Sequence, residues 1–350
     1  MTTADTSRAA HLVGSLPGAT AAEAMATALD VLGPHLRSIP DGETGERRNW
    51  VISIVESLRD HPDLELVRQG HWTDYDDLPR LRVRPGHRLY GANLDFGHVA
   101  AVRDSYPALE ELRTQHGRPD LAFQSGVPGD FDLAMFTLGP VGALTNRRPF
   151  TEATLTEIRG VAAATRPDTV FQIEVPVELV LLTKLPPRAR PAAAARFGAV
   201  IAGLAQASPA GTRFGLHLCL GDMNNRPFGT MGDVSPLVLL SNAVTRRWPD
   251  GRPLEYVHAP FAAADQPAPV GAGHEAYYAP LRDLRLPSGT RFVAGFAHES
   301  QDLADQLRIR TLVDELVGRP VDVAAACGLG RRSVEDGRRV LERTAELVTA

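Results

Sequence analysis

The sequence is poor in cysteine, with only Cys219 and Cys327 in 350 residues. So few cysteines exclude a small secreted scaffold held together by disulfides. The chain also lacks the basic start and continuous apolar core of a secretory signal, and its longest apolar stretches, such as 197–207, are too short to cross a bilayer. We therefore expect a cytoplasmic protein with no membrane partner and with both thiols free for chemistry.

The chain also has no excess of charge of either sign. Its formal net charge is -5, with 23% charged and 43% hydrophobic residues, values typical of an ordinary globular protein. There is no overall basic field of the kind that attracts nucleic acid, so nucleic acid is not an expected partner. A chain of 350 residues suits two domains or one large α/β barrel. No break in composition divides it, so we expect one domain over 1–350.

Short apolar runs alternate with helical patterns along nearly the whole chain. Eight such runs are expected to be strands, beginning near Leu12, Leu36, Leu121, Thr169, Arg213, Leu254, Arg291 and Val321. Eight strands that each lead into a helix predict a closed parallel (β/α)8, or TIM, barrel rather than an open sheet.

The region from His61 to Gly91 interrupts this alternation between the second and third predicted strands. It is rich in Pro, Gly, Asp and Arg, and two alternating runs, 64–67 and 81–83, predict a hairpin. We interpret it as an insertion. Whether it is a lid over the barrel or a contact between subunits stays open, as does a homo-oligomeric state.

His217 and Cys219 stand two positions apart near the end of a predicted buried strand. Side chains at i and i+2 of a strand project from the same face, so both point into one space. Imidazole and thiolate are good zinc ligands. The alternative is a histidine of the core beside a small buried cysteine.

Cys327 ends the last predicted strand, and the carboxyl ends of the strands in a (β/α)8 barrel converge on one face. His217, Cys219 and Cys327 together form a sensible catalytic zinc set that leaves a position for substrate. For a fourth ligand the strand 254–258 offers Glu255 and His258. We prefer His258, because it lies at the strand end where the others are, although a histidine bonded to backbone is an alternative.

Six motifs, each at a predicted strand end and in the correct order, resemble a known family. They are Val13-Gly14-Ser15-Leu-Pro17, Asp41-Gly-Glu43, Gln172-Ile-Glu174-Val-Pro176, His217-Leu-Cys219, Gly295-Phe-Ala-His298 and Cys327-Gly-Leu-Gly-Arg331. This order resembles the catalytic C-terminal barrel of cobalamin-independent methionine synthase, within the wider superfamily of zinc thiol-alkyl transferases and uroporphyrinogen decarboxylase-like barrels. The resemblance spans nearly the whole chain.

The resemblance implies a role for each matching residue. It implies zinc as cofactor, with His217, Cys219 and Cys327 as ligands and His258 where the family has a glutamate. It implies a substrate pocket made of Gly14, Ser15, Asp41, Glu43 and Glu174, and His298 as the acid that protonates the leaving group. The second acid of the family's Asp-Glu-Pro motif is Val175 here, and 138–150 has no tryptophan of the kind that stacks on folate.

The expected reaction is zinc-dependent transfer of a methyl or other alkyl group to a small thiol, with an alkyl donor as second substrate and with Glu43, Glu174 and His298 as catalytic residues. Opening of an epoxide by a thiol, or cleavage of a thioether, is the alternative on the same zinc barrel. A non-catalytic zinc or small-molecule binding protein is a further alternative.

Each acid and base also has a structural interpretation. Glu43 can pair with Arg47 or Arg48, and Glu174 can be a buried acid paired across the barrel. His298 can be an ordinary loop histidine.

Overall fold

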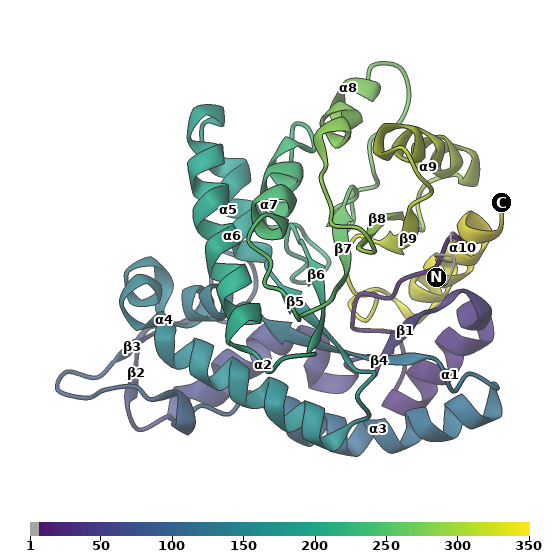
Figure 1. Ribbon diagram of the computed structural model, residues 1–350. Coiled ribbons are helices and arrows are strands. Elements are labelled where there is room, and N and C mark those ends of the chain that lie inside the picture. The colour runs from purple at the N-terminus through teal and green to yellow at the C-terminus, as the bar shows by residue number, and fades with distance from the viewer. Residues whose placement is uncertain (1–6) are drawn as a thin grey trace.

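The computed structural model describes residues 7–350, and its centre is a curled parallel sheet of seven strands (Figure 1). The sheet order is β1-β4-β5-β6-β7-β8-β9. The strands are β1 Ser38–Pro40, β4 Ala122–Pro128, β5 Val170–Glu174, β6 Arg213–His217, β7 Leu254–Pro260, β8 Arg291–Ala297 and β9 Asp322–Ala325. All six neighbouring pairs are parallel, as the sequence predicts.

The first of the eight predicted strands, near Leu12, is reduced to a bridge. Ala10 pairs with Leu36, which precedes β1, and with Val323 in β9. The amide of Ala10 donates to His35 O, and the amide of His11 donates to Val323 O. This segment therefore occupies the eighth position between the two outermost strands. It stays short because the turn at Gly14 and Ser15 leaves the sheet at once, and the arrangement is that of a TIM barrel.

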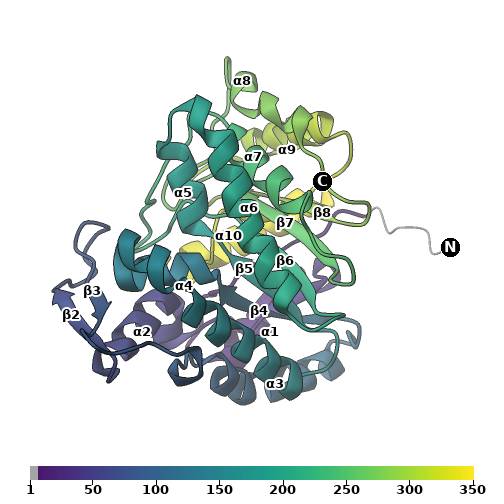
Figure 2. The same ribbon diagram turned by 60° about the vertical axis from the view of Figure 1, so that its left-hand side comes forward.

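Helices cover the outside of the sheet, and in Figure 2 α5, α6 and α7 lie in front of β5, β6 and β7. The α-helices are α1 Ala21–Leu32, α2 Trp50–Ser57, α3 His98–Gln115, α4 Asp130–Ala164, α5 Pro176–Lys184, α6 Arg190–Ala207, α7 Ser235–Thr245, α8 Glu275–Tyr278, α9 Leu303–Val317 and α10 Val334–Thr349. The last helix is capped at its start, since Ser333 Oγ accepts from the amide of Asp336 at 3.0 Å.

Helix α4 starts much earlier than the sequence suggests. Its pattern predicts a helix from Thr151, whereas helical structure begins at Asp130. Pro140 would ordinarily end a helix, but Gly139 breaks the helix just before it, with φ 68° and ψ −175°. The proline therefore falls at the start of a new helical stretch, where its missing N–H costs little.

The insertion forms the predicted hairpin. Strands β2 Leu64–Arg68 and β3 Arg80–Val83 pair antiparallel in a separate sheet, which projects from the side of the barrel next to α4 in Figures 1 and 2. Its buried residues Leu64 and Leu81 join a second hydrophobic core with residues of α2 and α4, while the main core runs from Ala10 to Leu347. Within residues 7–350, no helix is both long and apolar enough to cross a membrane.

Candidate metal centre

The end of β6 places His217 among side chains from the adjacent strands β5 and β7. Glu174, His217 and His258 are in register across β5, β6 and β7. All three are buried, with at most 7% of the residue exposed. One level deeper, Gly215 leaves room for the ring of Tyr256, because a Cβ there would lie 2.0 Å from that ring. The barrel interior is therefore filled up to the level of His217.

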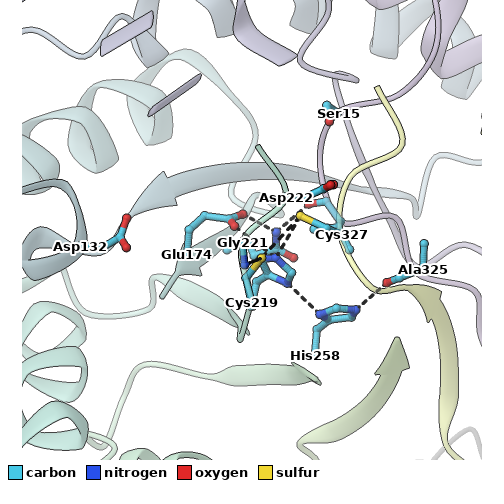
Figure 3. A network of polar contacts seen from close by, with 12 residues as sticks. Ser15, Asp132, Glu174, Cys219, Gly221, Asp222, His258, Ala325 and Cys327 are labelled. Atoms are coloured by element: carbon cyan, nitrogen blue, oxygen red, sulfur yellow. Dashed lines mark hydrogen bonds and ion pairs between the residues drawn. The ribbon is translucent and has the colours of Figure 1, made fainter. Parts of the chain in front are cut away.

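His217, Cys219 and Cys327 meet at the carboxyl end of the barrel, and Figure 3 shows the two labelled cysteine side chains next to each other. The two sulfurs are 3.6 Å apart, and Cys327 Sγ lies 3.8 Å from His217 Nε2. A tetrahedral zinc ion with ordinary bond lengths separates two sulfurs by about 3.8 Å and a sulfur from a nitrogen by about 3.6 Å. The three side chains thus fit such an ion.

His258 lies behind His217 and away from the sulfurs, which differs from the position expected of a fourth ligand. Its Nε2 donates to the carbonyl of Ala325 at 2.9 Å, and its Nδ1 lies 2.7 Å from His217 Nδ1 (Figure 3). The alternative ligand Glu255 is near the start of β7, where it pairs with Arg213 at 2.8 Å. Among the described residues, the group of mutually close ligand atoms consists of His217, Cys219 and Cys327.

The contacts of His258 determine which nitrogen of His217 faces the sulfurs as an acceptor. Burial lowers the pKa of His217 well below its usual value and that of His258 to about 4, so both rings are neutral. The Ala325 carbonyl can only accept, so His258 carries its proton on Nε2 and accepts on Nδ1. His217 must then donate from Nδ1, which leaves the lone pair of Nε2 directed toward Cys327.

The two thiols differ in acidity. The hydrogen bond from Cys219 lowers the pKa of Cys327. Arg331 lowers this pKa as well, because its Nη2 lies 3.2 Å from Cys327 Sγ. That hydrogen bond and burial raise the pKa of Cys219 well above its usual value. Arg331 is itself held by Asp222 at 2.9 Å. A positive group therefore already stabilises negative charge on sulfur at this site.

Glu174 lies beside the cluster. Its Oε2 is 3.5 Å from His217 Nε2, and its Oε1 accepts from Gln172 at 2.7 Å. Burial raises the pKa of Glu174 well above its usual range, and the nearby carboxyl of Glu43 raises it further. The two carboxyl groups converge over Gly126, where a Cβ would lie 3.0 Å from Glu43 Oε1 and 3.4 Å from Glu174 Oε1.

Glu43 closes over the turn at Gly14, whose Cβ, if present, would lie 2.8 Å from a Glu43 oxygen. Burial raises the pKa of Glu43 to about 7. Ser15 is buried, and its hydroxyl accepts from the amide of Gly330 at 3.3 Å. The turn, Glu43 and Glu174 therefore lie close together, but of these only Glu174 is among the residues that line the pocket containing the cysteines.

Asp41 is engaged by its own loop. Its carboxylate accepts from Arg47 at 2.7 Å, from Ser105 at 2.9 Å and from the amide of Glu43 at 3.0 Å. It holds the loop that carries Glu43. Arg47, which the sequence offers as a possible partner of Glu43, pairs with Asp41 instead.

His298 faces another part of the structure. Its Nε2 lies 3.2 Å from the carbonyl of Ala264, and its Nδ1 accepts from the amide and hydroxyl of Ser300. Glu299 is 3.5 Å from the ring and pairs with Arg332 at 3.1 Å. His298 does not line the pocket that contains the cysteines, so in this structure it does not reach that pocket as a proton donor.

That pocket has a volume of about 100 Å³, and Glu174, Cys219 and Cys327 form its polar floor. Its walls are mostly apolar and come from four parts of the chain: Trp50, Trp72, Tyr75, Phe136, Met223 and Phe228. Our sequence interpretation missed these walls, and it gave no role to Asp222 or Arg331. The arginine four residues after Cys327 was the available signal, because that spacing brings a cation close to the sulfur.

Solved structures resemble the chain over nearly its whole length. One is a B12-independent methionine synthase from Shewanella sp. W3-18-1 in complex with selenomethionine, at 12% identity and a TM-score of 0.57, covering 98% of this chain and 97% of that one. Another is a methyltransferase from Methanosarcina mazei, at 14% identity and a TM-score of 0.59, covering 99% and 96%. No family model and no curated sequence matches the chain. The likeness that the sequence motifs suggest is therefore confirmed as one of fold, and the chain folds like the B12-independent methionine synthase and methyltransferase structures.

Proposed function

We propose that this protein transfers a methyl or other alkyl group to a small thiol, with zinc held by His217, Cys219 and Cys327. The observation that carries the proposal is the spacing of the three ligand atoms, all within 4.8 Å of one another, with Cys219 and Cys327 lining a pocket. Three protein ligands leave a fourth position for substrate, as in catalytic rather than structural zinc sites. The fold likeness to methionine synthase structures supports the same reaction class.

Zinc in this position would lower the pKa of an incoming thiol and keep its sulfur nucleophilic at neutral pH. The thiolate forms a new sulfur–carbon bond with its own electron pair. The bond between that carbon and the donor's leaving group breaks, and the leaving group departs with the bonding pair.

The side chains around the pocket prepare this step. His258 keeps His217 in the tautomer whose Nε2 is an acceptor, and Arg331 stabilises the thiolate of Cys327. Glu174 is the carboxyl group nearest His217 Nε2 and lines the pocket, so we assign it a contact with the bound thiol. Glu43 lies close to Gly14 and, over Gly126, to the carboxyl group of Glu174.

Metal analysis of four purified proteins tests the ligand set. We expect one zinc per chain in the wild type and in His98→Gln, a change at a buried histidine whose Nδ1 lies 4.0 Å from Glu157. Cys219→Ser and Cys327→Ser should each lose the bound zinc, because the hydroxyl is a poor zinc ligand. Equal zinc in all four proteins would overturn the assignment.

An alkylation assay then tests the reaction. Zinc-loaded protein is offered small thiols together with methyl donors or epoxides, and thioether formation is measured. We expect thioether product from the wild type and a loss of at least a hundredfold in Cys219→Ser. Product from epoxides alone would identify ring opening as the reaction, and zinc binding without product from any pair would leave a binding protein.

A further inference from the structure

The hairpin insertion forms part of the wall of the pocket above the cysteines. The segment between β2 and β3 carries Trp72 and Tyr75, which both line the pocket. The Tyr75 hydroxyl accepts from the amide of Met223 at 2.9 Å, and its ring stacks on Phe228 with centroids 4.3 Å apart. The side chain of Asn224 donates to the carbonyl of Trp72 at 2.9 Å. The insertion thus docks onto the loop that follows Cys219.

The backbone of both partners is shaped for this contact. Trp72 has φ 59°, in the left-handed region that few side chains adopt, and Asn224 has φ 55°. Gly221 has φ 82°, and a Cβ there would lie 2.5 Å from the Tyr75 hydroxyl. Trp72 is anchored by its indole N–H, which donates to Glu56 at 2.6 Å. These residues hold the two loops together directly above the sulfurs.

Away from the proposed zinc position, the described side chains of the pocket leave no free cation for an anionic group. Of the described residues that line it, the charged ones are Glu174, Asp222 and Arg331. Arg331 is the sole cation among them, and it is committed to Asp222 at 2.9 Å and to Cys327 at 3.2 Å. Apart from the proposed zinc at the sulfurs, this lining holds no free cation that would compensate a carboxylate or phosphate for its lost hydration, which is strongly unfavourable.

The volume limits what fits. The cavity measures about 100 Å³, and apolar cavities of about 150 Å³ bind benzene. This volume is of the order that one six-membered ring or a short branched alkyl chain would fill. Aromatic walls suit such a group, because offset and edge-on ring contacts add to the gain from burial.

From this geometry we infer that the pocket binds an uncharged, apolar group of about the size of a benzene ring, with Trp72 and Tyr75 of the insertion as part of its wall. The inference rests on the proposed function for its chemical meaning, in which this group is the alkyl or aryl part of the molecule whose carbon is joined to sulfur. The binding of such a group can be tested without any reaction.

Binding of three probes to the wild type, measured after the metal has been removed with a chelator, tests the inference. Toluene and isopropylbenzene are uncharged, and benzenesulfonate carries a negative charge on a group of similar bulk to isopropyl. The fluorescence of Trp50 and Trp72, which line the pocket, reports occupancy. We expect saturable binding of at least one hydrocarbon, and binding of benzenesulfonate at least tenfold weaker. No saturable hydrocarbon binding, or equal affinity for the sulfonate, would overturn the inference.

A filled pocket provides the matched control. Ile52→Phe adds bulk to the pocket wall, and Leu144→Phe adds a phenylalanine side chain at a surface position that is 76% exposed. We expect hydrocarbon affinity to fall at least tenfold in Ile52→Phe and to stay unchanged in Leu144→Phe, with the melting temperature of each confirming the fold. Unchanged affinity in Ile52→Phe would place the probe elsewhere and refute the inference.

Zinc content and thioether formation are measured on the same preparations before the metal is removed. A protein that binds hydrocarbon but holds no zinc removes the proposed function and leaves the apolar pocket in place. A protein that holds zinc and alkylates thiols but binds no hydrocarbon refutes the inference alone.

Discussion

The neighbours of His258 determine whether this side chain can act as a metal ligand. Its place at the end of β7 is where the sequence expects a fourth zinc ligand, but its Nδ1 is 2.7 Å from His217 and its Nε2 is bonded to Ala325. A partner that fixes the tautomer of a ligating histidine commonly changes metal affinity by 10- to 100-fold. In the proposed zinc site, His258 would therefore act on the metal through His217.

Substitution of His258 distinguishes a role as a direct zinc ligand from a role in fixing the tautomer of His217. We expect His258→Leu to weaken zinc binding by about 10- to 100-fold, because His217 Nδ1–H loses its acceptor. His258→Gln retains a side-chain oxygen acceptor and should lose less. A competition titration with a chromophoric chelator measures both. Complete loss of zinc in both variants, as expected for Cys219→Ser, would instead make His258 a direct ligand.

Glu43 makes stability depend on pH. Burial raises its pKa in the folded protein to about 7, from an ordinary value of 4.5. The folded state therefore keeps a proton that the unfolded chain releases, and the protein loses stability as pH rises from about 4.5 to about 7. The shift corresponds to about 3 kcal/mol as an upper value.

The measurement is urea unfolding of metal-free wild type and Glu43→Gln at several pH values. Relative to the variant, the wild type should become less stable by up to about 3 kcal/mol between pH 4.5 and 7. Glu46→Gln, at an exposed position of the same loop, is the control. A wild type that gains stability against Glu43→Gln over this range would contradict the burial argument.

At the scale of elements, the hairpin of β2 and β3 packs against α4 at its kink, Gly139. Gly139 has φ 68° and ψ −175°, a conformation almost confined to glycine, and a Cβ there would lie 2.6 Å from Nε of Arg80 in β3. The helix thus changes direction where the insertion packs against it. This contact positions the segment that lines the pocket.

Two glycine substitutions test the kink. Gly139→Ala should lower the free energy of unfolding by about 1–3 kcal/mol, because alanine is strained in that conformation. Gly203→Ala, in the helix α6 with no atom near its added Cβ, should raise it by about 0.5–1 kcal/mol. Urea titration measures both. Equal effects of the two changes would show that Gly139 is not under this constraint.

Elements with local signals could be predicted from the sequence, and those that depend on distant contacts could not. The hairpin 64–83 follows from alternating runs, and the meeting of Cys219 with Cys327 follows from strand ends that share one face of the barrel. The docking of Tyr75 on Phe228 depends on two loops far apart in the chain. No local pattern specifies such a contact.

At the scale of the whole molecule, closure of the barrel brings the site together. Ala10 joins both outermost strands of the sheet, and the turn that follows it places Ser15 against Gly330, just after Cys327. The predicted first strand failed as a strand but lies in the expected position. The orientation of the His258 ring could not be predicted, because a strand end fixes where a side chain starts and not which atom it meets.

X-ray absorption at the zinc edge of the purified wild type tests the central claim most directly. We expect zinc to have two sulfur neighbours at about 2.3 Å together with nitrogen or oxygen neighbours, and a third sulfur when a small thiol is added. A zinc shell without sulfur, or one that stays unchanged when the thiol is added, would contradict it.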